Sequence, residues 1–434
     1  MTGRTLGWPS IVRLGLVQSA IGAVVMLATS LLNRVMVVEY ALSAAIPGGL
    51  VAWHYAVQLS RPIWGHGYDS GKRRTPWIVG GMAALASGAL LAIAALPLLG
   101  ARHWAGLPLS IFAFALIGAG VGAAGTSLLA LLATRVAPER RAAAAAITWI
   151  MMVAGIAITA GVAGALIEPF TLPRLVRVAS GVAVGAFLVS LFAVLGVERG
   201  AAPEVAAPRA ATDFAAALRE LWADRDARRF TIFVFVSMLA YSMQDLILEP
   251  FSGLLFGFTP GASTQLSGVQ HGGVLAGMIL TGIGGSAFAG RGTRDLRRWI
   301  FGGCLGSGLA LAGLAFAAHV GPGWPLSVNI FLLGFANGVF AVAAIGSMMQ
   351  LAGAAGPRRE GIRMGVWGAS QAVAFGAGGL IGAVGVDLGR HLLGETDRAF
   401  ALVFTVEAML FLVAAALAVG AARVTRSAPV EATA

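Results

Sequence analysis

Two clusters of polar residues interrupt the apolar segments of this sequence, and ionisable groups in such surroundings are costly enough to be candidates for function. The clusters are Asn33, Arg34 and Glu39, and Gln244, Asp245 and Glu249. If the two segments face each other, Arg34 can pair with Asp245 or Glu249, which would form an external gate or a docking site for a partner. The alternative is a structural ion pair or ordinary interfacial charge.

Two histidines in apolar surroundings are candidate ligands. His54 lies in the segment WHYAVQ, with Gln58 one helical turn further on. A neutral imidazole there could ligate the central Mg of a chlorin, with Trp53 or Tyr55 stacking nearby. The alternative is a hydrogen bond to a neighbouring helix. The same two interpretations apply to His271.

The sequence lacks the motifs typical of nucleotide hydrolysis, metal-dependent catalysis and prenyl transfer, and we predict neither a catalytic residue nor a metal site. There is no phosphate-binding G-x-x-x-x-G-K-(S/T) loop and no H-E-x-x-H pair. The single cysteine, Cys304, excludes a disulfide framework and a Cys-based metal site. Asp-rich motifs that would hold Mg-diphosphate at span ends are also missing. Glu407, an acid within the last apolar segment, is a candidate proton site or a neutral glutamic acid.

The composition is that of an integral membrane protein. Of 434 residues, 58% are hydrophobic and 11% are charged, with a mean hydropathy of +0.84. A soluble protein carries about 25% charged residues. The 60 glycines favour closely packed helices, whereas barrel strands would alternate apolar and polar residues.

We predict an all-α fold with twelve transmembrane helices. The apolar segments are 11–32, 41–60, 77–99, 107–134, 142–167, 175–196, 230–248, 268–290, 299–319, 325–351, 362–386 and 399–420. Each has about the 20 residues that a membrane-spanning helix needs.

The positive charge follows the topology. With both termini inside, 24 of the 30 Lys and Arg residues lie on the inner side, as the positive-inside rule predicts. The six on the outer side are Arg34, Arg102, Arg174, Arg177, Arg390 and Arg398. The net charge of +11 therefore reports orientation, and we predict no nucleic-acid partner.

One long polar segment, 197–229, divides the chain into two sets of six spans. It begins as a Pro/Ala linker. From the N-cap candidates Thr212 and Asp213 onward, its apolar residues share one helical face, as in an amphipathic helix on the inner membrane surface. We predict an N-terminal bundle at 1–196, this linker, a C-terminal bundle at 230–422 and a cytoplasmic tail at 423–434.

The two halves also repeat each other weakly. PERR after the fourth span matches PRRE after the tenth, and Trp149 matches Trp367. Glu168 and Asp387, the acids expected to close the fifth and eleventh spans, lie in the same register. Two pseudo-symmetric six-helix bundles joined by a linker are typical of the major facilitator fold.

The basic loop RPIWGHGYDSGKRRTPW resembles the signature loop between helices 2 and 3 of the major facilitator superfamily. The matching residues are Gly65, Asp69, Gly71, Lys72, Arg73 and Arg74. The match departs from the pattern at Ser70, which replaces the usual cation, and in a spacer one residue short. The resemblance implies a loop that locks the inner ends of neighbouring helices and releases them as the bundles rock. The alternative is a basic loop that only sets topology.

Longer segments resemble one branch of this superfamily. NRVMVVEY, HYAVQLSRP, GKRRTPWIVGGM and QDLILEPF are similar to the PucC/LhaA family, the bacteriochlorophyll-delivery branch. The resemblance covers nearly the whole chain. It implies a factor that assembles light-harvesting complexes and binds or delivers bacteriochlorophyll in the inner, intracytoplasmic membrane of a phototroph. The expected partners are membrane lipid, bacteriochlorophyll or its precursor, and antenna polypeptides.

The resemblance implies no required cofactor and no enzymatic activity, although bound bacteriochlorophyll is expected. A proton-coupled secondary transporter of a small solute is the alternative. A subunit of late bacteriochlorophyll synthesis is a third interpretation, which nothing in the sequence requires.

Overall fold

The computed structural model describes residues 6–59, 74–101, 103–137, 140–198, 219, 222–287, 294–354 and 357–420. Within these ranges the chain is helical and contains no β-strand. The first half comprises α1 (Trp8–Met26), η1 (Leu27–Leu32), η2 (Val35–Glu39), α2 (Ala45–Gln58), α4 (Thr75–Ala101), α5 (His103–Arg135), α6 (Arg141–Ile167) and α7 (Leu172–Val194). The second half comprises α9 (Arg225–Met243), η4 (Gln244–Leu246), α10 (Leu248–Phe256), α11 (Pro260–Ala287), α12 (Arg294–Val320), η5 (Gly321–Gly323), α13 (Leu326–Ala354), α14 (Pro357–Leu393) and α15 (Thr396–Gly420).

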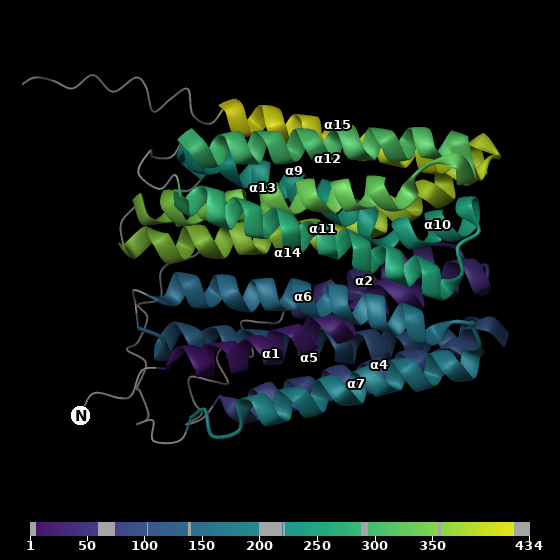
Figure 1. Ribbon diagram of the computed structural model, residues 1–434, viewed down its shortest axis with the longest axis horizontal. Coiled ribbons are helices and arrows are strands. Elements are labelled where there is room, and N and C mark those ends of the chain that lie inside the picture. The colour runs from purple at the N-terminus through teal and green to yellow at the C-terminus, as the bar shows by residue number, and fades with distance from the viewer. Residues whose placement is uncertain are drawn as a thin grey trace, which may run out of the picture.

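The helices form two stacked bundles, with α1 to α7 below and α9 to α15 above in Figure 1. One core cluster contains buried residues from Leu6 to Val194 together with Leu246, and the other contains residues from Phe230 to Ala418. We call the end that carries the α6–α7 and α10–α11 connections the distal end, and the end where α1 begins the proximal end. The predicted topology puts the distal end outside the cell. The domain boundaries at 197–229 stay a prediction, because most of that segment lies outside the described residues.

Ten described helices are long and apolar enough to cross a membrane, or eleven if the bent pair of α9 and α10 is one span. The predicted second span is represented by α2, whose 14 residues extend about 21 Å, less than the roughly 30 Å of a hydrocarbon core. The eighth span begins at Pro260, earlier than expected, and the eleventh extends past Asp387 to Leu393. The all-helical membrane fold predicted from the sequence is confirmed.

The first span differs from the prediction at its distal end. The predicted span ends at residue 32, but the helical path continues through Asn33 and Arg34 to Glu39. The wide π-helical turn η1 precedes these two residues and η2 follows them, and such turns occur frequently at functional sites. The two polar residues are therefore held inside a helix.

The seventh span is bent by 41° between Leu246 and Leu248. Pro250 explains the bend, because its ring clashes with the carbonyl four residues earlier and its nitrogen has no hydrogen to donate. The carbonyl of Leu246 therefore loses its helical partner. α10 ends at Phe256 and is capped by Gly257, whose φ of +69° is the left-handed conformation that glycine adopts easily.

The halves meet along two helix pairs, α6 with α11 and α2 with α14. At the first crossing, a Cβ on Gly164 would lie 2.7 Å from the carbonyl oxygen of Gly261, and one on Gly261 would lie 2.4 Å from that of Gly164. The backbones touch there because neither residue has a side chain. Small residues allow such contacts between membrane helices.

We expect Gly164→Ala to weaken the contact between the halves, because the added methyl group overlaps a backbone atom that cannot rotate away. The expected destabilisation is about 1–3 kcal/mol. Gly161→Ala is the matched control, since a Cβ at Gly161 meets nothing within 4 Å. Apparent unfolding temperatures in detergent would test this, and equal values for the two variants would contradict it.

Candidate functional site

The polar cluster predicted on the first span meets the second half of the chain at the distal end, and we call this region the polar seam. Asn33, which is 1% exposed, donates from Nδ2 to the carbonyl of Leu246 at 2.7 Å. This is the carbonyl that Pro250 leaves without a helical partner. A side chain of one half thus satisfies a backbone group that the other half cannot satisfy alone.

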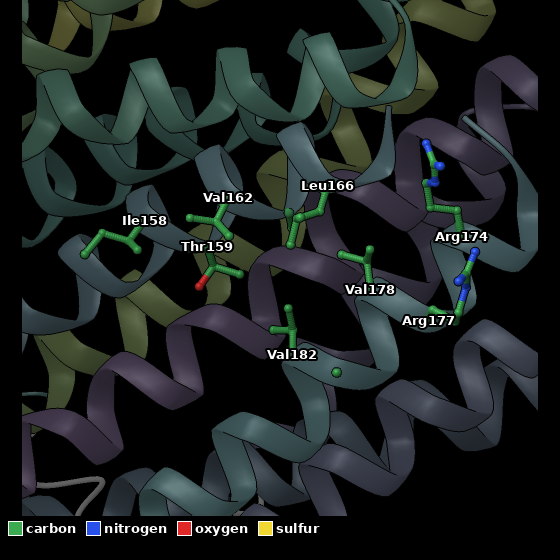
Figure 2. A pocket seen from close by; sticks show the side chains of 10 residues that line it. Ile158, Thr159, Val162, Leu166, Arg174, Arg177, Val178 and Val182 are labelled. Atoms are coloured by element: carbon green, nitrogen blue, oxygen red, sulfur yellow. The ribbon is translucent and has the colours of Figure 1, made fainter. Parts of the chain in front are cut away.

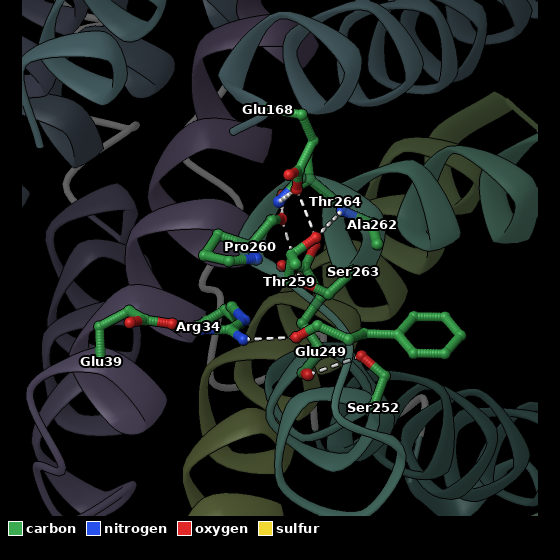
Figure 3. A network of polar contacts seen from close by, with 12 residues as sticks. Arg34, Glu39, Glu168, Glu249, Ser252, Thr259, Pro260, Ala262, Ser263 and Thr264 are labelled. Carbon is green, nitrogen blue, oxygen red and sulfur yellow. Dashed lines mark hydrogen bonds and ion pairs between the residues drawn. The ribbon is translucent and has the colours of Figure 1, made fainter. Parts of the chain in front are cut away.

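Arg34 crosses the polar seam in a similar way, as Figure 3 shows. Its Nη2 donates to the carbonyl of Phe258 at 2.7 Å, and its Nη1 pairs with Glu39 at 2.5 Å. Gly253 makes room for the guanidinium, because a Cβ there would lie 2.9 Å from Nη2. The predicted ion pair of Arg34 with Asp245 or Glu249 is wrong. The π-helical turns place Glu39 of the same half within reach instead.

Glu249 lies at the polar seam with another partner. It is 3% exposed and accepts a hydrogen bond from the hydroxyl of Ser30, which lies 3.2 Å from the hydroxyl of Ser267 on α11. The second carboxylate oxygen of Glu249 has no hydrogen-bond partner among the described residues. Sequence reasoning missed both serines. Ser30 could have been found, since it lies one helical turn before Arg34.

The two remaining members of the second cluster do not bond to the first cluster. Gln244 is fully buried, and neither of its amide atoms has a partner in the described part of the chain. Asp245 is half-buried beside it. The predicted cluster is therefore partly assembled: Asn33, Arg34 and Glu249 bridge the halves, Glu39 holds Arg34, and Gln244 and Asp245 lie apart from these bonds.

Two carboxylates clamp the halves together beside the polar seam. Glu168, just after α6, accepts hydrogen bonds from the hydroxyl of Thr259 and, at 3.0 Å, from the amide of Gly261 at the start of α11. Asp387 on α14 accepts from the Ser43 hydroxyl at 2.5 Å and the Ala45 amide at 2.8 Å, at the start of α2. Each acid thus satisfies the free amides at a helix N-terminus of the opposite half.

These two clamps are equivalent positions of the internal repeat. One links the end of the fifth predicted span to the eighth, and the other links the eleventh to the second. The internal repeat identified both acids, because they lie in the same register of the two halves, but it predicted no role for them. Together with the polar seam, they hold the distal ends of the bundles closed.

We expect the double change Glu168→Ala and Asp387→Ala to open the distal end. A net loss of about 1 kcal/mol per clamp would raise the open population about 30-fold. The measurement is the rate at which a water-soluble maleimide labels a Gln244→Cys substitution, in a chain whose native cysteine is replaced by Cys304→Ala.

Glu395→Ala is the control, because this exposed acid directly precedes α15 and pairs with Arg398 in the first turn of that helix. Labelling that stays at the control rate in the double variant would show that the clamps do not hold the bundles together.

The predicted switching loop lies largely outside the described residues, including Gly65, Asp69, Gly71, Lys72 and Arg73. Arg74 is described, and its Nη1 donates to the carbonyl of Ala130 on α5 at 2.6 Å. Glu198, beyond α7, accepts from the amides of Arg74 and Thr75 and from the Thr75 hydroxyl at 2.6 Å. This acid caps α4 and was not anticipated from the sequence.

Burial of Glu198 opposes its ionisation, but the hydrogen bonds from Thr75 and from the two amides outweigh it and lower the pKa of the carboxyl. A lowered folded pKa means that the cap stabilises the protein above the ordinary glutamate value of about 4.3 and loses this effect as the pH falls through the folded value.

We therefore expect Glu198→Gln to cost about 1 kcal/mol at neutral pH, the usual worth of a helix cap. The difference from the unchanged protein should shrink below about pH 4, where the wild-type carboxyl also becomes neutral. Unfolding temperatures of both proteins across this pH range would test the expectation. A difference that does not change with pH would contradict it.

The two candidate pigment ligands differ in how they are placed. His54 is 2% exposed, and its Nε2 lies 2.8 Å from the Gln58 amide nitrogen, so this nitrogen is engaged inside the bundle. His271 is half-buried, and its Nδ1 lies 2.9 Å from the carbonyl of Ser267. A carbonyl accepts only from a protonated nitrogen, which leaves the lone pair on Nε2 of His271 available to a ligand.

Glu407 is fully buried in α15, and neither carboxylate oxygen has a hydrogen-bond partner among the described residues. Among those residues, no group of three or more His, Cys, Asp or Glu side chains could hold a metal ion. The sole cysteine, Cys304, is buried in α12.

Comparison with known proteins points to one family. The family model described as PUCC protein matches residues 31–426. A relative from Rhodobacter capsulatus, named Bacteriochlorophyll synthase 44.5 kDa chain, is 52% identical over 419 residues, 96% of each chain. Protein PucC of Cereibacter sphaeroides is 30% identical over 382 residues, 84% of this chain and 81% of the relative.

Solved structures show the fold. A crystal structure of the peptide transporter POT in complex with sulfate has a TM-score of 0.69 and 16% identity, over 97% of each chain. A bacterial homologue of the human drug peptide transporters PepT1 and PepT2 has a TM-score of 0.70 and 13% identity, over 96% of this chain and 98% of that one. The major facilitator fold predicted from the sequence is confirmed. At these low sequence identities, the similarity to the two transporters concerns the fold alone.

Proposed function

The chain belongs to the PUCC protein family, and we propose that it is an assembly factor for photosynthetic light-harvesting complexes. In this role it binds bacteriochlorophyll or its precursor and delivers it to antenna polypeptides. It works as a multi-pass protein of the inner, intracytoplasmic membrane, with both termini in the cytoplasm.

The observation behind this proposal is the family match over residues 31–426. The name of the 52% identical relative links that protein to bacteriochlorophyll. The same name includes the word synthase, but a transporter-like fold supports a protein that moves or holds a molecule more than one that transforms it. We therefore propose a role without catalysis, in which pigment is cargo.

Within the chain, His271 is the better of the two candidate pigment ligands. Its Nδ1 is fixed by the Ser267 carbonyl, so that Nε2 is the nitrogen offered to a chlorin Mg. Ser267 lies one helical turn away on the same face of α11 and reaches Ser30 across the polar seam. A pigment on His271 would therefore lie next to the contact between the halves.

Deleting the gene from a phototrophic host should lower antenna absorption while pigment precursors remain. Restoring the gene with His271→Leu should leave antenna absorption low, whereas His54→Leu should restore it. The unchanged protein, purified in mild detergent, should retain bacteriochlorophyll, and His271→Leu should reduce the retained pigment more than about tenfold, since even outer-shell partners of a metal site contribute that much.

Unchanged antenna absorption after gene deletion would reject the assembly role. Pigment retained equally by both histidine variants would reject the ligand. Gel filtration and an unfolding curve of each variant separate a lost ligand from a lost fold.

The alternative is proton-coupled transport of a small solute, which the buried Glu249 at the contact between the halves favours. A colourless purified protein that takes up solute into vesicles under a proton gradient, and fails to do so after Asp69→Asn or Glu249→Gln, would favour this function over pigment delivery.

A further inference from the structure

A groove of about 570 Å³ lies between α6 and α7. Figure 2 shows its side chains. Apolar residues and Gly181 form most of the lining, Thr159 adds a hydroxyl, and two arginines lie at one end: the lining residues are Ile158, Thr159, Val162, Ala163, Leu166, Arg174, Arg177, Val178, Gly181 and Val182.

The groove faces the membrane. Ile158, Val162 and Leu166 are 65%, 54% and 58% exposed. In the most apolar stretches of α6 and α7, 28% of the residues are buried inside the protein, the lowest share among the described spans. Large apolar side chains with this exposure on a membrane helix are in contact with lipid.

The length of the groove along the two helices matches the thickness of one leaflet of the hydrocarbon core. From Ile158 to the end of α6 at Ile167, the helix rises about 14 Å, and from Leu172 to Val182 on α7 it rises about 15 Å. Half of a hydrocarbon core is about 15 Å. A transmembrane helix of a partner would need a surface that crosses the whole core, so the groove has the length of a lipid chain instead.

The charges lie where a lipid headgroup would be. Arg174 and Arg177 are close to the start of α7 and therefore at the distal end of the groove. Arg174 is fixed by its Nη1, which donates to the carbonyls of Glu168 and Pro169. Arg177 is exposed and has no hydrogen bond or ion pair to the described residues. These are two of only six cations predicted outside, where the positive-inside rule disfavours them.

We propose that this groove binds an anionic phospholipid of the outer leaflet, with its phosphate at Arg174 and Arg177 and one acyl chain along Gly181. Arg177 presents an unengaged guanidinium, which forms paired hydrogen bonds with phosphate. The volume of the groove lies within the range of small-molecule sites. This proposal is independent of pigment delivery.

The test is native mass spectrometry of the full chain, delipidated in detergent and then supplied with phosphatidylglycerol or phosphatidylcholine with the same acyl chains. The unchanged protein should bind phosphatidylglycerol about tenfold more tightly, because both lipids offer a phosphate but the two arginines repel the choline cation of phosphatidylcholine. Arg177→Gln should remove this preference. Gly181→Leu should reduce binding of both lipids, because a Cβ there meets nothing within 4 Å and the new side chain occupies the groove.

Arg390→Gln and Gly80→Leu are the matched controls, an exposed arginine on α14 and an exposed glycine on α4 with equal free space, and both should bind as the unchanged protein does. Equal binding of the two lipids, or phosphatidylglycerol binding that survives both Arg177→Gln and Gly181→Leu, would overturn the proposal. So would displacement of phosphatidylglycerol by an isoprenoid diphosphate at a lower concentration, or a second polypeptide found over the groove.

Discussion

The structure depends on one requirement of the membrane interior, namely that every backbone polar group needs a partner within the protein. Near the distal end the helices are interrupted, and their free groups are satisfied by the opposite half. Pro250 frees the Leu246 carbonyl, which Asn33 occupies. The new ends at α10 and α11 expose the Phe258 carbonyl and the Gly261 amide, which Arg34 and Glu168 occupy. The bundles are therefore joined through the backbone groups that become free where their helices are interrupted.

This arrangement makes the contact between the halves polar, and a polar contact can break and form again. Apolar packing gains little in lipid, because the lipid chains are as apolar as the side chains they replace. Hydrogen bonds at helix ends can instead be exchanged for water when the bundles separate. A carrier that opens needs such a contact, whereas a permanent seal does not. The glycine contact between α6 and α11 complements it as a close approach that needs no polar group.

Much of the fold could be predicted from the sequence, because apolar length and the placement of cations report spans and orientation directly. The repeat also identified Glu168 and Asp387 as equivalent. What they bind could not be predicted, since their partners are backbone amides, which every residue except proline has, and the hydroxyls of Thr259 and Ser43, which lie far away in the chain. The error at Arg34 has a similar cause: the π-helical turns that bring Glu39 into reach leave no clear mark in the residue types. Glu198 was missed because its partners lie more than a hundred residues earlier in the chain.

The clamps have a consequence for how this chain can change over generations. Although Ala44 is buried and Ser43 donates through its hydroxyl, Asp387 is also held by the amide of Ala45, and a change of that half-buried side chain leaves the amide bond in place. Drift there should be silent, while replacement of the acid removes the whole contact at once. Variation at positions that donate only through their amide, combined with constancy of the two acids, would thus be the record that this kind of contact leaves in related sequences.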